Sequence, residues 1–111
     1  MSDDLEFRRN ADQAIENLTK ALFAAEDQGE FEVEEQNGVL NIVFEEPAGK
    51  FVITPNAPVQ QIWISALSTS FKLNWNAEDG VFYLPKTGEP LKLLVARLIG
   101  EHLGSDPISL T

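Results

Sequence analysis

Acidic side chains gather in one short segment of this 111-residue chain. Six carboxylates and no base occur within ten residues, at Glu26, Asp27, Glu30, Glu32, Glu34 and Glu35. Carboxylate oxygens are suitable ligands for hard cations such as Fe²⁺, Fe³⁺, Mn²⁺ or Ca²⁺. On one face of a strand, however, successive carboxylates lie roughly 7 Å apart, too far for several to chelate one ion tightly. The segment therefore predicts a surface that holds cations loosely, although charge runs are more often solvated faces that serve solubility.

A second candidate is the segment 60–65, Gln-Gln-Ile-Trp-Ile-Ser, which alternates like a β-strand after a proline-rich entry. Ile62 and Ile64 would share the face toward a core. Gln61 and Trp63 would lie on the opposite face. Tryptophan is strongly enriched at binding hot spots, so an outward Trp63 would be a recognition residue. The alternative is that Trp63 only covers neighbouring strands, and alternation does not decide between the two.

Residues that support enzymatic chemistry are few. The chain has no cysteine, which excludes disulfides, thiolate metal sites and iron–sulfur clusters held by its own thiolates. Its single histidine, His102, falls late in a predicted helix, where we expect a surface residue rather than a base. The sequence also lacks a glycine-rich phosphate loop and a serine in a nucleophile-elbow context. We therefore expect a protein that is not an enzyme.

The net charge of the chain is −10 at pH 7, and the N-terminal part carries all of it. Residues 1–46 contain thirteen of the eighteen acidic residues and three of the eight basic ones, whereas residues 47–111 contain five of each. Phosphate contacts need a basic surface, so this distribution argues against nucleic acid as a direct partner. It favours a cation or a basic protein surface.

Hydropathy and the first residues bear on location. No apolar run approaches the roughly 20 residues of a membrane-spanning helix, so we expect no membrane segment. The acidic start at 1–4 lacks the apolar stretch of a secretory signal and the basic character of a transit peptide. We expect a cytoplasmic protein, or a mature form that has already been trimmed.

The elements that position these residues follow from hydrophobic periodicity. Helical periodicity predicts one helix over about 4–27, with an apolar stripe of Ala11, Ile15 (or Ala14), Leu18, Leu22 and Ala25. A second helix begins near Pro90 and ends at Gly104, with a stripe of Leu91, Leu94, Val95 and Leu98. Between them, alternation predicts short strands at 30–34, 39–44, 51–54, 60–65, 71–75 and 81–84, and a loop at 68–70.

The connections between these strands are short, which predicts an antiparallel meander. Asn37-Gly38 is a strong hairpin signal because both residues tolerate positive φ. Two amphipathic helices would then cover one face of a sheet of five to six strands. We expect an α+β fold, a two-layer α-β sandwich, with residues 1–111 forming a single domain.

Several segments together resemble a known family. They are NGVLNIVF at 37–44, FVI at 51–53 and NAPVQQIWIS at 56–65, with residues 6–8, 11–13, Gly88, Leu91 and Leu94 in support. In these segments the chain resembles the frataxin family, including its bacterial CyaY branch. The resemblance covers nearly the whole chain, and the Gln-Ile-Trp block after the proline turn is its most specific part.

The resemblance implies weak iron binding on an acidic ridge along the first helix and first strand. It also implies docking on the cysteine desulfurase–scaffold complex that builds iron–sulfur clusters, and a cytoplasmic place in a bacterium. The implied ridge comprises Asp3, Asp4, Asp12, Glu16, Glu26, Asp27, Glu30, Glu32 and Glu34. The implied partner-binding residues on the sheet are Gln61, Trp63, Asn56 and Lys72.

The chain departs from the family pattern in places. Thr19-Lys20 and Phe23-Ala24 stand where bacterial relatives carry acidic pairs, so the ridge is thinner and strong iron binding is not expected. Phe23 would be either an exposed apolar residue or an extension of the core stripe beside Leu22. Asn74 replaces a usual aspartate before Trp75.

From these features we expect an iron-binding regulator of iron–sulfur cluster assembly. It would be a monomer, with an iron-dependent oligomer as the alternative state. The alternative function is an acidic protein-interaction module on the same fold, without a metal role. An enzymatic role stays open only as a ferroxidase-like side activity of bound iron.

Overall fold

The chain forms a helix, then six strands, then a second helix, in the order in which helical and strand periodicity alternate along the sequence. The computed structural model describes residues 2–29, 31–45, 48–104, 108 and 110, with side chains from residue 5 to 26 in the first segment. Its elements are α1 (Ser2–Gly29), β1 (Phe31–Gln36), β2 (Val39–Glu45), β3 (Ala48–Asn56), the short 3₁₀ helix η1 (Ala57–Val59), β4 (Gln61–Ala66), β5 (Thr69–Asn76), β6 (Val81–Tyr83) and α2 (Leu91–Leu103).

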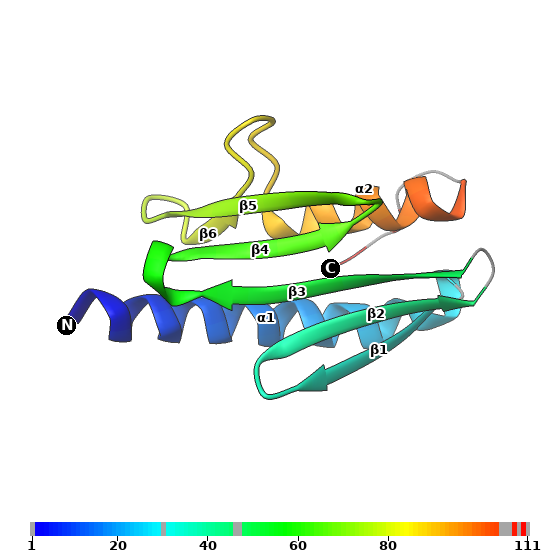
Figure 1. Cartoon of the computed structure of the whole chain (residues 1–111), viewed down its shortest axis with the longest axis horizontal. Coiled ribbons are helices and arrows are strands. Elements are labelled where there is room, and N and C mark those ends of the chain that lie inside the picture. The colour runs from blue at the N-terminus through cyan, green and yellow to red at the C-terminus, as the bar shows by residue number, and fades with distance from the viewer. Residues whose placement is uncertain (1, 30, 46–47, 105–107, 109, 111) are drawn as a thin grey trace.

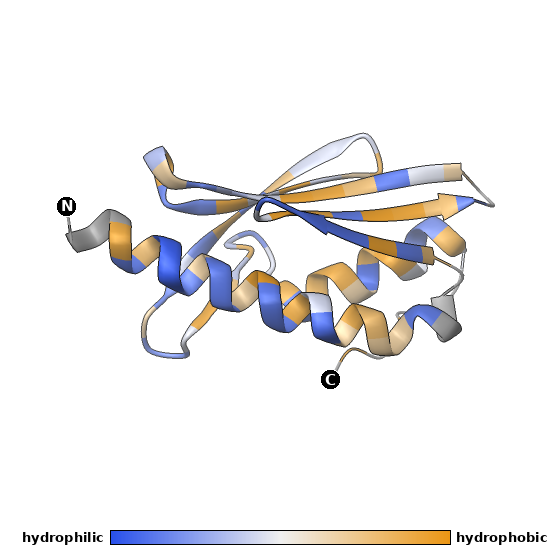
Figure 2. Ribbon diagram, turned by 90° about the horizontal axis from the view of Figure 1, so that it is seen from below, coloured by the Kyte–Doolittle hydropathy of each residue, from blue (hydrophilic) through white to orange (hydrophobic). Residues whose placement is uncertain are grey.

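The six strands form one antiparallel sheet in the order β1-β2-β3-β4-β5-β6, so each strand pairs with its neighbour in sequence. Both helices cover the same face of this sheet (Figure 1). Seen from the side, the molecule has two layers, with α1 and α2 side by side against the sheet (Figure 2). The expected two-layer α+β sandwich is confirmed. We call the sheet face that carries neither described helix the outer face.

Both helices bury their predicted stripes against the inward residues of the sheet. In α1, Ile15 is buried and its alternative Ala14 is half-buried. Fully buried members of the common core include Leu18, Leu22, Leu94, Leu98, Ile62 and Ile64. No helix among the described residues has the length and apolar character needed to cross a membrane.

The connection between β4 and β5 differs from the expected loop at 68–70. The strands pair as far as Ala66 and Thr69, so Leu67 and Ser68 alone form the turn. Both turn residues have positive φ, 53° and 59°. Such two-residue turns match the twist of antiparallel strands, but they usually contain Asn-Gly. The loop prediction was wrong because Leu-Ser carries no such signal.

His102 lies in the last turn of α2, as expected, but its side chain is half-buried rather than fully exposed. Its ring lies against Phe44, with 4.2 Å between centroids, and meets Phe51 edge-on at 5.8 Å. A Cβ atom at position 49 would collide with the imidazole, so Gly49 leaves room for it. His102 therefore joins the end of α2 to the aromatic residues of β2 and β3.

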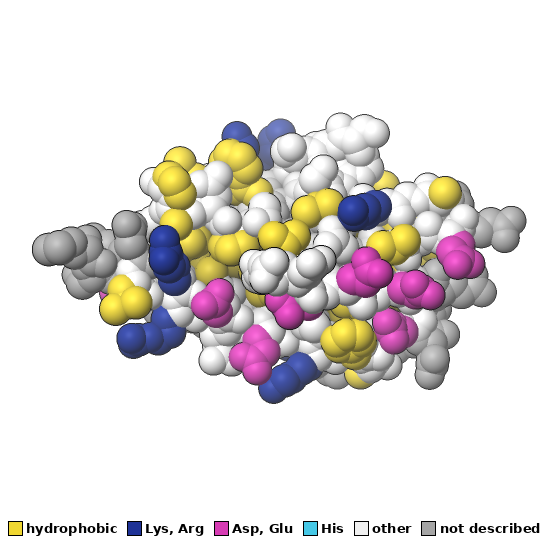
Figure 3. Space-filling model, turned by 60° about the horizontal axis from the view of Figure 1, so that its bottom comes forward, with side chains coloured by type: hydrophobic (Ala, Val, Ile, Leu, Met, Phe, Trp, Pro, Cys, Tyr) yellow, Lys and Arg dark blue, Asp and Glu magenta, His cyan; other side chains and the backbone are white. Residues whose placement is uncertain are grey.

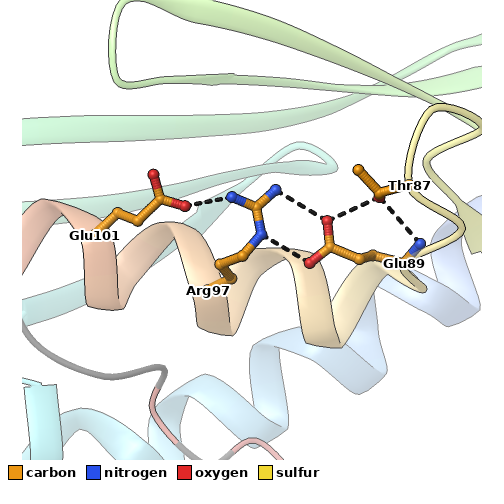
Figure 4. A network of polar contacts seen from close by, with 4 residues as sticks. All are labelled: Thr87, Glu89, Arg97 and Glu101. Atoms are coloured by element: carbon orange, nitrogen blue, oxygen red, sulfur yellow. Dashed lines mark hydrogen bonds and ion pairs between the residues drawn. The ribbon is translucent and has the colours of Figure 1, made fainter.

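A polar network joins the loop before α2 to the helix itself (Figure 4). The Arg97 guanidinium donates two hydrogen bonds to the Glu89 carboxylate, at 2.8 and 2.9 Å, and also contacts Glu101. The Thr87 hydroxyl donates to Glu89 at 2.8 Å. The hydrogen bonds from Arg97 hold the pKa of Glu89 below its ordinary value, outweighing the opposing effect of burial. The same contacts raise the pKa of Arg97.

Candidate functional site

The outer face brings together the four residues expected to bind a partner. Trp63 and Lys72 are Cα partners across β4 and β5, and Asn56 is the partner of Gln61 across β3 and β4. Gln61 and Trp63 are two residues apart on β4, so the two pairs form adjacent rows on one face. We call Asn56, Gln61, Trp63 and Lys72 the tryptophan patch.

Contacts within this patch fix the Trp63 ring. Its indole Nε1–H donates to Gln61 Oε1 at 2.9 Å. Lys72 Nζ lies 4.9 Å from the ring centroid, in the position of a cation–π contact. Trp63 is half-buried, so its strand neighbours cover part of the ring and part stays open to solvent. The ring therefore covers neighbouring strands and is accessible at the same time.

The amide of Gln61 makes a second hydrogen bond, which the sequence did not suggest. Gln61 Nε2 donates to Asn74 Oδ1 at 2.9 Å, so Asn74 belongs beside the patch. Alternation within residues 71–75 could have placed Lys72 and Asn74 on one face. The pairing of Asn74 with Gln61 depends on strand register, which no local pattern specifies.

Acidic side chains gather over α1 and β1, and Lys and Arg side chains also lie on this face (Figure 3). Asp12 and Glu16 are exposed on α1, and Glu32 and Glu34 are exposed on β1. The neighbours of the β1 pair, such as Val33, are buried toward the helices, so Glu32 and Glu34 project from the outer face. The structure therefore splits the described ridge between two sides of the sheet edge.

Two carboxylates of the expected ridge, Glu16 and Glu26, and the nearby Glu35 already have partners within the chain. Glu26 Oε2 accepts a hydrogen bond from the backbone N–H of Val33 at 3.1 Å. Glu16 forms an exposed ion pair with Lys20 at 3.5 Å. Glu35 Oε2 accepts from the N–H of Gly38 in the β1–β2 turn at 3.0 Å. These contacts give the carboxylates structural roles.

A groove of about 480 Å³ runs between α1 and the β1–β2 turn. It is lined by Asp12, Ile15, Glu16, Thr19, Lys20, Phe23, Glu35 and Gly38. Phe23 is 51% exposed here, so it does not extend the core stripe. Glu35, which belongs to the acidic segment 26–35 but not to the ridge implied by the resemblance, is the β1 carboxylate that faces α1. Its alternation with Phe31 and Val33 could have shown this.

The described carboxylates do not build a chelating iron centre. Among the residues with described side chains, no group of three or more His, Cys, Asp or Glu residues could hold a metal ion. Four ridge residues expected from the sequence, Asp3, Asp4, Asp27 and Glu30, lie outside the described side chains. What the described part of the ridge offers is dispersed negative charge.

The fold, two helices on one face of a six-stranded antiparallel sheet, is similar to that of a solved structure. The structure resembles the frataxin from Psychromonas ingrahamii, with a TM-score of 0.78 over 96% of this chain and 98% of that one. The sequences are 18% identical, so this comparison concerns the fold alone.

The family follows from the sequence. The family model for the frataxin-like domain matches residues 1–105, and the chain therefore belongs to this family. It is 28% identical over 94 residues to the iron–sulfur cluster assembly protein CyaY of Pseudomonas fluorescens (strain SBW25), covering 83% of this chain and 84% of that protein. It is 30% identical over 84 residues to CyaY of Pseudomonas paraeruginosa (strain DSM 24068 / PA7), covering 75% and 77%. The expected relationship to frataxins is confirmed.

Proposed function

We propose that this chain takes part in iron–sulfur cluster assembly as a non-enzymatic adaptor in the bacterial cytoplasm. It would dock on the complex of a cysteine desulfurase with its scaffold protein through the tryptophan patch. Membership of the frataxin-like family and two relatives named as iron–sulfur cluster assembly proteins support this role. The observation that carries the docking proposal is the half-open Trp63 ring, held by Gln61 and Lys72 on the outer face.

The geometry of the patch suits protein recognition. The ring presents a broad apolar surface, and the amide and ammonium groups beside it can make directional contacts. Because Trp63 is already held by its neighbours, docking would cost little side-chain entropy. A central aromatic side chain of this kind usually contributes a large share of the binding energy.

The acidic ridge would act at longer range. Exposed carboxylates speed the encounter with a basic partner surface, and salt weakens that effect. Iron would be bound weakly there as cargo, because the described carboxylates are dispersed and do not chelate. The carboxylates would concentrate the ion near the surface, and no catalytic step is assigned to them.

A second candidate function is an acidic interaction module without a metal role. It is favoured by the hydrogen bonds and the ion pair that Glu16, Glu26 and Glu35 form within the chain, because these contacts account for the carboxylates without a metal. Both candidates share the docking surface. They differ in whether iron changes affinity for the partner.

Titration of wild type and Trp63→Ala against the desulfurase–scaffold complex tests the proposal. We expect Trp63→Ala to weaken binding by ~2 kcal/mol or more at both low and high salt, because the contact is apolar. Phe23→Ala is the matched control, since it removes an exposed ring from the groove beside α1. Equal affinities of wild type and Trp63→Ala in both conditions would exclude the outer face as the docking surface.

A further inference from the structure

We propose that Asn74 is a positioning residue for Trp63 and acts through the side-chain amide of Gln61. The inference rests on the proposed function insofar as Trp63 is the docking residue. It assigns a role to a residue that itself need not contact the partner.

The geometry forms a relay from β5 to β4. Asn74 Oδ1 accepts from Gln61 Nε2 at 2.9 Å, and Gln61 Oε1 accepts from the Trp63 indole Nε1–H at 2.9 Å. All three side chains are half-buried on the outer face. The amide of Gln61 therefore uses its donor toward Asn74 and its acceptor toward Trp63.

The indole N–H, which can only donate, and the Asn74 oxygen together favour the present orientation of the Gln61 amide. Rotating the Gln61 amide by half a turn would place its NH₂ group against the indole N–H, two donors facing each other. The same rotation would place its oxygen against Asn74 Oδ1, two acceptors facing each other, unless the Asn74 amide rotated as well. With the acceptor at position 74 removed, only the indole favours the present orientation. Asn74 therefore adds a second restraint on the amide that holds the indole N–H.

A second contact from β5 supports the ring on its face. Lys72 Nζ lies 4.9 Å from the Trp63 centroid, and Lys72 and Asn74 are two residues apart on β5. The edge of the indole is thus fixed through Asn74 and its face through Lys72. Because both come from one strand, β5 fixes the ring orientation before a partner arrives. Such preorganisation lowers the cost of docking.

The first test observes the free protein by NMR. The chain has two tryptophans, and Trp63→Phe identifies the Trp63 indole resonance by its loss. Asn74→Leu removes the acceptor and replaces it with a side chain of similar size. We expect it to shift this resonance toward its position in Gln61→Leu, and to speed indole hydrogen exchange about twofold to fivefold, the range for weakening one hydrogen bond.

Two control variants separate positioning from a general structural effect. Asn74→Asp keeps an acceptor for Gln61 Nε2 and should leave the Trp63 resonance in place. Ser70→Ala changes an exposed residue elsewhere on β5 and should have no effect. The proposal is overturned if the resonance in Asn74→Leu coincides with that of wild type. It is also overturned if Asn74→Asp shifts the resonance as far as Asn74→Leu does.

The second test measures affinity for the desulfurase–scaffold complex. Asn74→Leu should weaken binding about fivefold, the value of roughly one hydrogen bond, and Asn74→Asp should restore it. In the Trp63→Ala background the same substitution should have no effect, because it acts through the ring. A loss of similar size in both backgrounds would contradict positioning. If Trp63→Ala binds like wild type, the docking proposal fails, while the NMR result still decides the role of Asn74.

Discussion

At the scale of single residues, the contact between Glu89 and Arg97 determines a response to pH. The hydrogen bonds from Arg97 lower the pKa of Glu89 from its ordinary value of 4.5. A carboxyl whose pKa is lowered in the folded state contributes its full stabilisation at pH values above its pKa in the unfolded chain. This contribution is lost as the pH falls through its pKa in the folded protein. The stabilisation by Glu89 is therefore lost at pH values below about 4.5.

We expect Glu89→Gln to reduce the free energy of unfolding by about 1 kcal/mol at neutral pH, a value for a well-oriented, partly exposed ion pair. The difference from wild type should shrink as the pH falls below 4.5 and through the lowered pKa of Glu89, because the wild-type carboxyl then becomes neutral as well. Urea unfolding across this range measures it. In an Arg97→Met background the difference should be small at every pH; a full-sized difference there would assign the effect to another partner of Glu89.

The sequence placed single residues correctly where alternation alone decides. Trp63 lies opposite Ile62 and Ile64, as their alternation predicts. Alternation could not show that Gln61 joins Trp63 to Asn74. Asn74 is thirteen residues away from Gln61 in the sequence, and strand pairing brings the two together. The packing of His102 against Phe44 depends likewise on where α2 ends over the sheet.

At the scale of elements, α1 offers adjacent residues with opposite environments. Leu22 is fully buried, whereas Phe23 is 51% exposed. Leu22→Ala should lower the free energy of unfolding by ~2–5 kcal/mol, the range for emptying a packed core position. Phe23→Ala is the matched control and should cost less than ~1 kcal/mol. Urea unfolding of both variants checks this, and similar losses would show that the buried stripe is wrongly assigned.

The β4–β5 turn offers a stabilising substitution. Leu67 and Ser68 have φ values of 53° and 59°, a region that costs energy for most side chains. Asn-Gly prefers this conformation, and the β1–β2 turn of this chain uses it at Asn37-Gly38. Replacing Leu67-Ser68 with Asn-Gly should therefore raise the free energy of unfolding by about 1 kcal/mol. A lower midpoint in thermal unfolding would mean that the Leu67 side chain contributes more than the turn strain costs.

Element types followed from the sequence more readily than this turn did. Both α-helices and the strands β1 to β5 arise from periodicity that extends over six or more residues, so local exceptions do not obscure it. A two-residue turn depends on two φ angles, and Leu67-Ser68 adopts them because the flanking strands pair. Pairing of the two flanking strands overrides the local preference of these residues there.

At the scale of the whole molecule, negative charge is divided between two surfaces. Asp12 and Glu16 line the groove beside α1, whereas Glu32 and Glu34 project from the outer face. We expect Mn²⁺ to broaden amide resonances weakly at both surfaces, and added salt to reduce the effect. Because the surfaces are separate, Glu32→Gln with Glu34→Gln should remove broadening only at β1.

The matched pair of variants for this experiment is Asp12→Asn with Glu16→Gln, which should remove broadening only along α1. The β1 variant should also unfold at a higher temperature, because like charges on one strand face repel each other. Broadening centred on a single position such as His102 would show that the ion binds outside the ridge.

The free edge of the sheet has a further consequence. β1 pairs only with β2 in the described sheet, so its other edge is a template on which a second extended chain could add. Glu26 from α1 occupies the N–H of Val33 in the middle of that edge, and Glu32 and Glu34 would repel an identical strand. The carboxylates of this region therefore also protect a concentrated solution of the protein against aggregation through strand addition.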